Sequence, residues 1–501
     1  MRLLISAFIL ASASQFGIAA FSPPFAVIGH RNHARRHDSA VRQQVSAATV
    51  SSSPLSSATI ATPERMDTAT TTIEPSSALR PVLPSHDDWI ATLDYQGFAK
   101  EVTSLGKELL QDSGPADVEH LNKIVLWRNL CALVGIATMW LPLNPISVLA
   151  LSTWTYSSWT MIAHHTCHGG YNRVMNTGDK YTSRGFALGS VWRRVADWCD
   201  WMQPEAWNIE HNRLHHYHLG ETKDPDLVQR NLEFMRESSI PLAIRYLAVG
   251  VLIPIWKWFY YAPNTYKELC INERKKQGIP LPDDFDPTEA ITVLSLLFPK
   301  AHQRTVREVV KPMDLLLKVW GPFFVSRFVL LPLPLLAIPT VGTTLFGHAI
   351  MNLVLAELLT NIHGFITIVT NHAGEDVYAF DDQVKPKTGA FYVRQIVGSV
   401  NYPGGTDGLD FMHGFLNYQI EHHVWPDLSM LQYQKGAPKL QAICDKYGVP
   451  YVNENVWERL RKTVDIMVGK TSMRPFPTHY EPIQDKGRVM WKTTNGAIDE
   501  E

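Results

Sequence analysis

Histidines with metal-ligand spacing are the residues of this sequence best suited to chemistry. The 501-residue chain contains 20 histidines, several of them in adjacent pairs. Neutral imidazole is the commonest side-chain ligand for iron, zinc and copper. Three clusters stand out, at residues 164–168, 211–216 and 419–423. The sequence therefore predicts a metal centre built mainly from histidine.

The first two clusters share a four-residue step. The first reads His-His-Thr-Cys-His, from His164 to His168, and the second reads His-Asn-Arg-Leu-His-His, with the same step from His211 to His215 and then His216. On a helix this step puts both imidazoles on one face, about a turn apart. They can then share one metal or bridge a pair of sites. The third cluster, Gln-Ile-Glu-His-His, offers adjacent ligands to two metals.

The bulk composition excludes some classes of protein. A formal net charge of -2 gives no general attraction to nucleic acid. The 5 cysteines are scattered singly with no Cys-x-x-Cys pair, which argues against a disulfide framework and a cysteine zinc site. A reducing compartment fits this usage.

The N-terminal residues have the composition of targeting sequences. An apolar run over residues 3–13 follows Arg2, and small residues precede Phe21, which is typical of a cleaved signal peptide. Residues 21–63 are rich in Ser, Ala, Thr and Arg and contain a single acid, Asp38. The tandem resembles the bipartite plastid presequence of algae with secondary plastids; the alternative is a secretory signal followed by a disordered linker. Residues 1–84 are therefore expected to be presequence and linker.

Apolar runs further along the chain form two hairpins. Residues 124–141 and 146–163 flank a Pro-Leu-Asn-Pro turn, and residues 320–338 and 345–367 flank a Pro-Thr-Val-Gly turn. Each run is near the ~20 residues that a membrane-spanning helix needs. A fifth apolar patch, residues 240–261, carries an arginine, a lysine and several aromatics, which indicates an interfacial or re-entrant helix.

These elements would bring the three clusters together. The first two clusters follow two membrane crossings and the third follows four, so all three lie on one side of the membrane. The expected fold is an all-α integral membrane domain over residues 85–470, with four transmembrane helices as two hairpins and a helical cap domain that carries the metal site. Residues 471–501 are expected to form a polar C-terminal tail.

The clusters, their spacing and the hairpins resemble the membrane fatty acyl desaturase superfamily over about residues 125–450. The third cluster, preceded by Asn-Tyr and followed by a Trp-Pro dipeptide, is similar to that of the front-end branch, in which Gln replaces the first histidine. Residues 211–226 are similar to the second histidine box and the acidic segment after it. The resemblance implies a non-heme di-iron centre, O2 as co-substrate, and an acyl chain on a lipid or thioester as substrate.

The resemblance also implies a set of metal ligands. These are His164, His168, His211, His215, His216, His422 and His423, with Gln419 at a weaker position. The superfamily draws one more histidine from near the end of the fourth span, and His372 is favoured over His363 because it should lie at the membrane boundary. Residues that could orient the ligand imidazoles as outer partners are His165, His218, Asp224, Asp226 and Glu421.

The sequence departs from the family in one respect, and this departure determines the expected electron donor. Front-end desaturases often carry a fused cytochrome b-type domain with a His-Pro-Gly-Gly motif, which this sequence lacks. Electrons would then come from a separate donor, ferredoxin in a plastid membrane, which is favoured, or a cytochrome in the endoplasmic reticulum. The acyl chain would lie in an apolar tunnel, with its mouth lined by tryptophans between the first two clusters, unless these are interfacial anchors.

Other functions use similar residues. A lipid or carotenoid hydroxylase or ketolase has the same di-iron chemistry. A zinc-dependent intramembrane hydrolase or receptor also places histidines at the ends of spans, but it needs only three or four ligands. A metal transporter should carry ionisable residues within several spans, whereas Glu357 is the only acid inside one.

Overall fold

The computed structural model describes residues 85–174, 179–299 and 305–487. The predicted presequence, residues 1–84, and residues 488–501 of the predicted tail lie outside the described residues. The described chain is mostly helical, as predicted, with one short parallel pair of strands, β1 (Tyr378–Ala379) and β2 (Arg474–Pro475).

The first helical hairpin delivers the first histidine cluster. Helix α4 (Pro115–Thr138) packs against α5 (Pro145–Tyr156), and α5 continues through a π-helical segment, η2 (Ser157–Ala163), into α6 (His164–Cys167). The Asn144 side chain accepts a hydrogen bond of 2.9 Å from the backbone N–H of Ile146. This cap, with proline as the first helical residue, defines where α5 begins.

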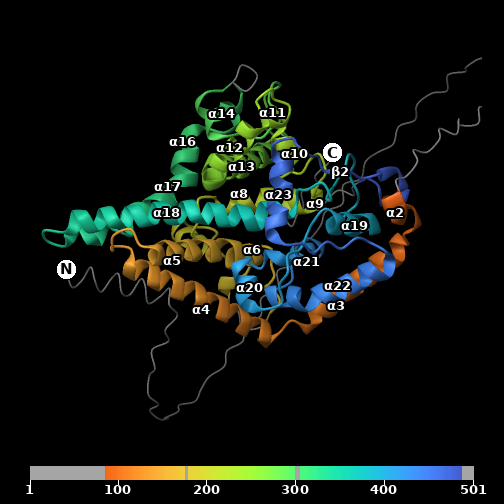
Figure 1. Ribbon diagram of the computed structural model, residues 1–501, viewed down its shortest axis with the longest axis horizontal. Helices are drawn as coiled ribbons and strands as arrows, with labels where there is room; N and C mark the ends of the chain where they lie inside the picture. The colour runs from red at the N-terminus through yellow and green to blue at the C-terminus, as the bar shows by residue number, and fades with distance from the viewer. Residues whose placement is uncertain (1–84, 175–178, 300–304, 488–501) are drawn as a thin grey trace, which may run out of the picture. The chain divides into compact units, whose positions relative to one another are not determined.

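Among the described residues, the two helices that are long and apolar enough to cross a membrane form the second hairpin. They are Pro312–Ala337 and Gly342–Asn371. The first is assembled from α16 (Pro312–Asp314), η9 (Leu315–Trp320), α17 (Gly321–Phe324), η10 (Val325–Leu330) and η11 (Leu333–Ala337). The second consists of α18 (Gly342–Ile368) and η12 (Val369–Asn371). In Figure 1, α18 runs alongside α5, with which it packs closely.

A third crossing depends on a bent pair of helices. Leu242–Ile255 and Lys257–Lys276 are apolar enough only together, and they meet at 81°. Such a bend suits the interfacial or re-entrant helix predicted there, and it would also suit a broken span.

The structure thus supports membrane helices, two or up to three of them among the described residues. The predicted first hairpin exists as α4 and α5, but these helices do not pass the same test of length and composition. Residues 117–128 of α4 include Asp117, Glu119, Lys123 and Arg128. The continuous helix from α5 to α6, residues 145–167, is rich in Ser and Thr. The four-crossing topology therefore stays a prediction.

Short helices fill the segment between the hairpins. They are α7 (Val191–Arg193), α8 (Pro204–Ile209), α9 (His216–His218), α10 (Val228–Asn231), α11 (Glu233–Arg236), α12 (Leu242–Leu252), α13 (Ala262–Lys276), α14 (Val293–Leu297) and α15 (Val306–Val309). Another π-helical segment, η5 (Glu210–His215), joins α8 to α9. Four more described segments are π-helical: η4 (Arg194–Trp198), η7 (Lys257–Tyr261), η9 and η10.

Helices from both ends of the described chain complete the domain. They are α2 (Asp88–Thr92), α3 (Tyr95–Asp112), α19 (Gly389–Val397), α20 (Asp407–Met412), α21 (Gln419–Val424), α22 (Met430–Tyr447) and α23 (Val456–Met467). Helix α3 packs along α22. The largest hydrophobic core includes Phe98 of α3, Ile396 of α19 and Tyr433 of α22, together with apolar neighbours of the histidine clusters such as Trp207 and Ile420.

The C-terminal segment is packed onto this domain as far as it is described. Strand β2 pairs with β1, and the buried Glu481 carboxylate accepts a hydrogen bond of 2.9 Å from Nε of Arg394 in α19. The predicted tail, residues 471–501, overlaps this packed segment, and its boundary stays a prediction.

Candidate metal centre

The three histidine clusters converge in two groups. Five histidines form the larger group, with their nearest ring nitrogens all within 4.8 Å of one another: His164, His168, His211, His216 and His422. Three form the smaller group by the same measure: His215, His372 and His423. The groups are adjacent, because the His216 and His423 rings stack with centroids 4.2 Å apart. The prediction that the three clusters can meet is confirmed.

Local helix geometry presents the rings of the first two clusters. The His164 and His168 rings lie 5.1 Å apart, and the His211 and His215 rings lie 5.2 Å apart. The sequence predicted ordinary α-helical turns, but π-helical turns precede the first cluster in η2 and include His211 and His215 in η5. Isolated π-helical turns are rare and are frequent at functional sites.

The structure separates the two candidates for the extra histidine. His372, just after η12, belongs to the smaller group. His363 lies on α18, where its Nε2 is 2.7 Å from the backbone oxygen of Met412 and its ring stacks on Tyr156 at 3.9 Å. His363 is therefore outside both groups.

Gln419 lies beside the smaller group. Its amide nitrogen is 2.9 Å from Nε2 of His372, and its amide oxygen is buried with no hydrogen-bond partner among the described residues. The nitrogen and oxygen ends of a side-chain amide are assigned from their surroundings. A half-turn of the Gln419 amide would place its oxygen toward His372. That orientation is the one a metal ligand needs.

Polar groups behind the rings orient several of them. Oδ1 of Asp224 lies 2.9 Å from Nδ1 of His215. Oε1 of Gln395, on α19, lies 3.1 Å from Nδ1 of His423, and the Tyr433 hydroxyl, on α22, lies 3.3 Å from Nδ1 of His422. Such partners fix the tautomer and orientation of a ligand ring. Sequence reasoning found Asp224 and missed Gln395 and Tyr433, which carry no spacing signal.

The other predicted outer partners have different contacts. His165 pairs through Nδ1 with the backbone oxygen of Met161 at 2.7 Å, and His218 pairs with Glu221 at 2.7 Å. Neither ring belongs to the two groups.

Glu421 also has partners other than a ligand ring. Its carboxylate accepts hydrogen bonds from Asn401 at 2.8 Å and Tyr451 at 2.7 Å. No contact among the described residues supports the expectation that Glu421 orients a ligand imidazole. Burial raises the pKa of this carboxyl to about 7.

Asp226 lies between the larger and smaller groups. One of its carboxylate oxygens is within 4.8 Å of ring nitrogens of His211 and His215. Its side chain shares a hydrogen bond with Glu210, a buried acid that sequence reasoning missed. Burial, and then the neighbouring Asp226, raise the pKa of Glu210 well above its ordinary range.

Burial keeps most of the rings neutral. It lowers the pKa well below the ordinary 6.5 for His164, His168, His211, His216, His422 and His423. Burial also lowers the pKa of His372 to about 3. His215 differs: burial opposes its charge, but the Asp224 carboxylate outweighs burial and raises its pKa.

These residues fit bound metal ions. Among the described residues, the ring nitrogens without any hydrogen-bond partner include Nε2 of His168 and His423 and Nδ1 of His211 and His216. Buried polar atoms are almost always paired, and neutral imidazoles suit iron. Two adjacent groups of mostly neutral rings, several of them with an unpaired nitrogen, can therefore hold two metal ions side by side.

Known proteins identify the family. The family model described as "Fatty acid desaturase" matches residues 138–455, more than half of the chain. The chain belongs to the fatty acid desaturase family. All eight histidines of the two groups, and Gln419, fall within the residues that match the family model.

Several curated desaturases match shorter stretches. The "NADPH-dependent stearoyl-CoA 9-desaturase" of Mycobacterium tuberculosis is 31% identical over 112 residues, 22% of this chain and 26% of that protein. The "Delta(8)-fatty-acid desaturase 1" of Arabidopsis thaliana is 29% identical over 103 residues, 20% of this chain and 22% of that protein. "Fatty acid desaturase 3" of Bos taurus is 29% identical over 140 residues, 28% of this chain and 27% of that protein.

In these matches the chain spans about a quarter of each relative's length. No solved structure matches the chain.

Proposed function

We propose that this desaturase family member introduces a double bond into the acyl chain of a lipid or acyl thioester. The observation that carries the proposal is the pair of adjacent, buried histidine groups within a chain that matches the desaturase family. The curated relatives that it matches are named as acyl desaturases.

Each group would hold one iron ion. The larger group supplies His164, His168, His211, His216 and His422, and the smaller group supplies His215, His372 and His423 with Gln419 beside them. When bound, the irons would enable O2 to oxidise the acyl chain. Two adjacent methylenes would each lose one hydrogen, and O2 would be reduced to two waters with two electrons from the donor and two protons.

The chain's own residues hold the histidine rings in place and exclude water from the site. Asp224, Gln395 and Tyr433 hold three of the rings from behind. The Trp207 ring stacks on His211 at 4.4 Å and is 1% exposed, so it covers one side of the larger group with apolar surface. An apolar cover excludes water from the reacting methylenes.

We propose that the substrate and the electron donor reach the site from a membrane surface. The four-crossing topology would place all histidine clusters on one side, with the bilayer supplying the substrate. The donor would be a separate protein, a ferredoxin if residues 1–84 direct the chain to a plastid membrane, or a cytochrome if it resides in the endoplasmic reticulum. No nucleic acid takes part.

Fatty acid profiling tests the proposal. The full chain and His215→Ala are expressed in a host of defined lipid composition together with a ferredoxin or a cytochrome donor. A new unsaturated fatty acid is expected with the wild type and not with the variant. A hydroxylated or keto product in its place would support the hydroxylase or ketolase instead.

Metal analysis of the purified protein distinguishes the zinc alternative. About two irons per chain are expected. About one zinc without iron would contradict the di-iron site and favour a zinc-dependent hydrolase or receptor.

A further inference from the structure

Four buried charges form a framework that the proposed chemistry does not use. Asp200, Lys257, Arg327 and Glu357 are each no more than 2% exposed. Lys257 pairs with Asp200, and Nε of Arg327 lies 3.8 Å from Oε1 of Glu357. Buried charges are costly even when paired, and within membrane segments they commonly mark functional sites.

Glu357 holds the indole of Trp201. The indole N–H of Trp201 donates a 3.0 Å hydrogen bond to Oε2 of Glu357. The Trp201 ring meets that of Trp258 edge-on, with centroids 5.5 Å apart. The paired Asp200 and Lys257 are the sequence neighbours of these two tryptophans. The framework therefore fixes the Trp201 indole from behind.

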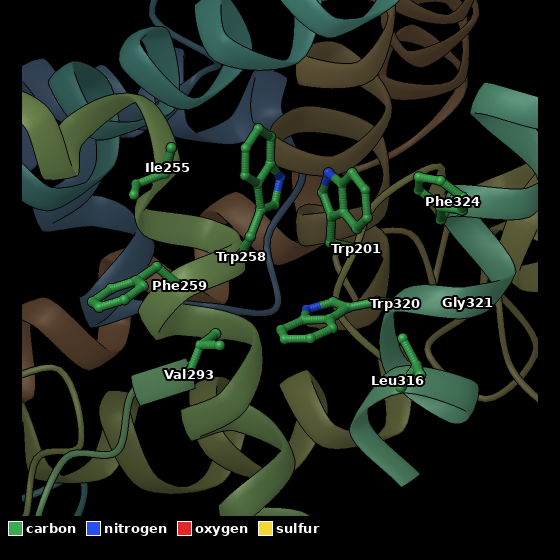
Figure 2. Close-up of a pocket in the computed structure, with 9 residues that line it drawn as sticks. All are labelled: Trp201, Ile255, Trp258, Phe259, Val293, Leu316, Trp320, Gly321 and Phe324. Atoms are coloured by element: carbon green, nitrogen blue, oxygen red, sulfur yellow. The ribbon is translucent and has the colours of Figure 1, made fainter. Parts of the chain in front are cut away.

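Trp201 and Trp258 are walls of a cavity of about 420 Å³. Figure 2 shows these two side chains and Trp320 projecting toward a common space, with Leu316 and Phe324 on the opposite side from Phe259. The surface that faces this space is apolar throughout.

An apolar cavity of this size selects a hydrocarbon ligand. A carboxylate or lipid headgroup would lose its hydrogen bonds there without replacement, whereas an alkyl chain would gain contact with the rings. Leu316 and Phe324, which are 51% and 49% exposed, belong to the membrane-spanning Pro312–Ala337. Lipid chains can therefore approach the cavity from the bilayer.

The cavity wall and the metal centre share one short chain segment. Trp201 lies three residues before α8, and α8 carries Trp207, whose ring stacks on His211. Trp198 meets Trp207 edge-on at 5.3 Å. Trp201 is thus joined to the larger histidine group by a short chain segment.

We propose that this cavity holds the methyl-terminal part of the substrate acyl chain, and that Glu357, through Trp201, is a positioning residue that sets the shape of the cavity. Cavity shape then determines which methylene lies at the metal centre. The proposal rests on the desaturase function proposed above.

The first test measures product selectivity. Wild type, Glu357→Gln, Glu357→Leu and Trp201→Phe are given saturated acyl chains of graded length, and the products are identified by chain length and double-bond position. Glu357→Gln keeps an acceptor oxygen for the indole and should resemble the wild type. Glu357→Leu and Trp201→Phe should each change the ratio of products by about tenfold, the effect of one methylene in an apolar pocket. The double variant should add little, because both changes break one interaction.

Asn352→Leu is the matched control for this test. It removes another buried polar side chain from α18, one that donates to the backbone oxygens of Met139 and Leu141 and not to the cavity wall. Its product ratio should be that of the wild type, and iron content should be normal in every variant. An unchanged product ratio in Glu357→Leu with normal iron content would overturn the role of Glu357.

The second test measures occupancy without catalysis. In the His215→Ala background, acyl chains brominated at the methyl end should quench tryptophan fluorescence more than chains brominated near the carboxyl. Trp258→Phe should reduce that difference, whereas Trp457→Phe, which removes a tryptophan that is 64% exposed on α23, should not.

The quenching test distinguishes failure of the cavity proposal from failure of the proposed desaturase function. Equal quenching by a brominated phospholipid that is not desaturated would assign the cavity to bulk lipid and overturn the proposal. An absence of unsaturated products from the wild type would overturn the desaturase function, while the quenching would still report whether an alkyl chain enters.

Discussion

The chemistry of single residues here depends on histidines that are buried and uncharged. A ring on the surface near neutral pH is partly protonated and already solvated, whereas the rings of both groups are largely enclosed, and burial keeps all of them except His215 neutral. Their unpaired nitrogens are then free to bind a cation.

His363, on α18, and His372, just after η12, should differ in metal binding. His372→Ala removes a member of the smaller group and is expected to lower iron from about two to about one per chain. His363→Ala removes a ring that packs on Tyr156 and should leave iron content unchanged. Metal analysis of both purified variants makes the comparison. Iron loss in His363→Ala alone would reverse the assignment.

Glu421 should make stability fall as pH rises. Its pKa is about 7 in the folded protein against an ordinary 4.5, so the folded state binds the proton more tightly between these values. Stability is greatest below about 4.5 and is lost as pH rises through about 7, by roughly 3 kcal/mol in all. Glu421→Gln cannot ionise, so it should gain stability relative to the wild type between pH 5 and pH 8. Thermal unfolding in detergent measures the gain, and a constant difference across this range would contradict the assignment.

At the residue scale, sequence spacing predicted the histidine ligands that recur at regular intervals along the chain. The step from His164 to His168 and the pair His422 and His423 were visible because ligands to one metal recur at helical intervals. Gln395 and Tyr433 were not, because each acts alone from a helix that contributes no metal ligand. Only the packing of α19 and α22 against α21 brings them to the rings.

At the scale of elements, α19 connects the C-terminal segment to the metal centre. Its Arg394 is 1% exposed and binds Glu481 and Asp382, while the next residue, Gln395, contacts His423. A buried arginine needs its carboxylates, because an unpaired buried charge is strongly destabilising. The segment after β2 therefore helps to hold a ring of the smaller group in place.

Glu481→Ala should destabilise the protein by about 3 kcal/mol, since it leaves a buried charge short of a partner. Arg394 keeps Asp382, so the loss should lie at the low end of the range for broken buried pairs. Glu108→Ala is the control, because it breaks an exposed pair with Lys439 and should change little. Thermal unfolding of both variants measures the difference, and equal losses would contradict the role of the buried pair.

Sequence reasoning located the elements better than their internal geometry. Proline-containing turns marked both hairpins, since proline fixes backbone angles and ends helices. The π-helical turns of η2 and η5 were not predicted, because a π turn comes from the tertiary demand on a side chain and not from local propensity. The charges at the start of α4 also shorten its apolar stretch.

At the scale of the whole molecule, the predicted topology assigns each exposed loop to one side of the membrane. With four crossings, the turn at Leu143 and the turn at Val341 lie on one side of the membrane, and Lys276 and Lys446 lie on the other. All four side chains are exposed. Single cysteines are placed at these positions in a background without the native cysteines. An impermeant maleimide should label positions 143 and 341 from one side of the membrane and positions 276 and 446 from the other. Labelling of Lys276→Cys from the side of Leu143→Cys would make the bent pair a complete span.

The distance along the chain between partners in the larger group also governs when the centre can form. His164 and His422, whose Nε2 atoms are 2.7 Å apart, are separated by 258 residues. During synthesis, four of the five rings are made by residue 216, but the fifth ring and most of the smaller group follow α18. The ribosome must therefore complete nearly the whole domain before either group is whole. If the two groups bind iron as proposed, metal acquisition would be a late step in biogenesis, after nearly the whole domain has been made.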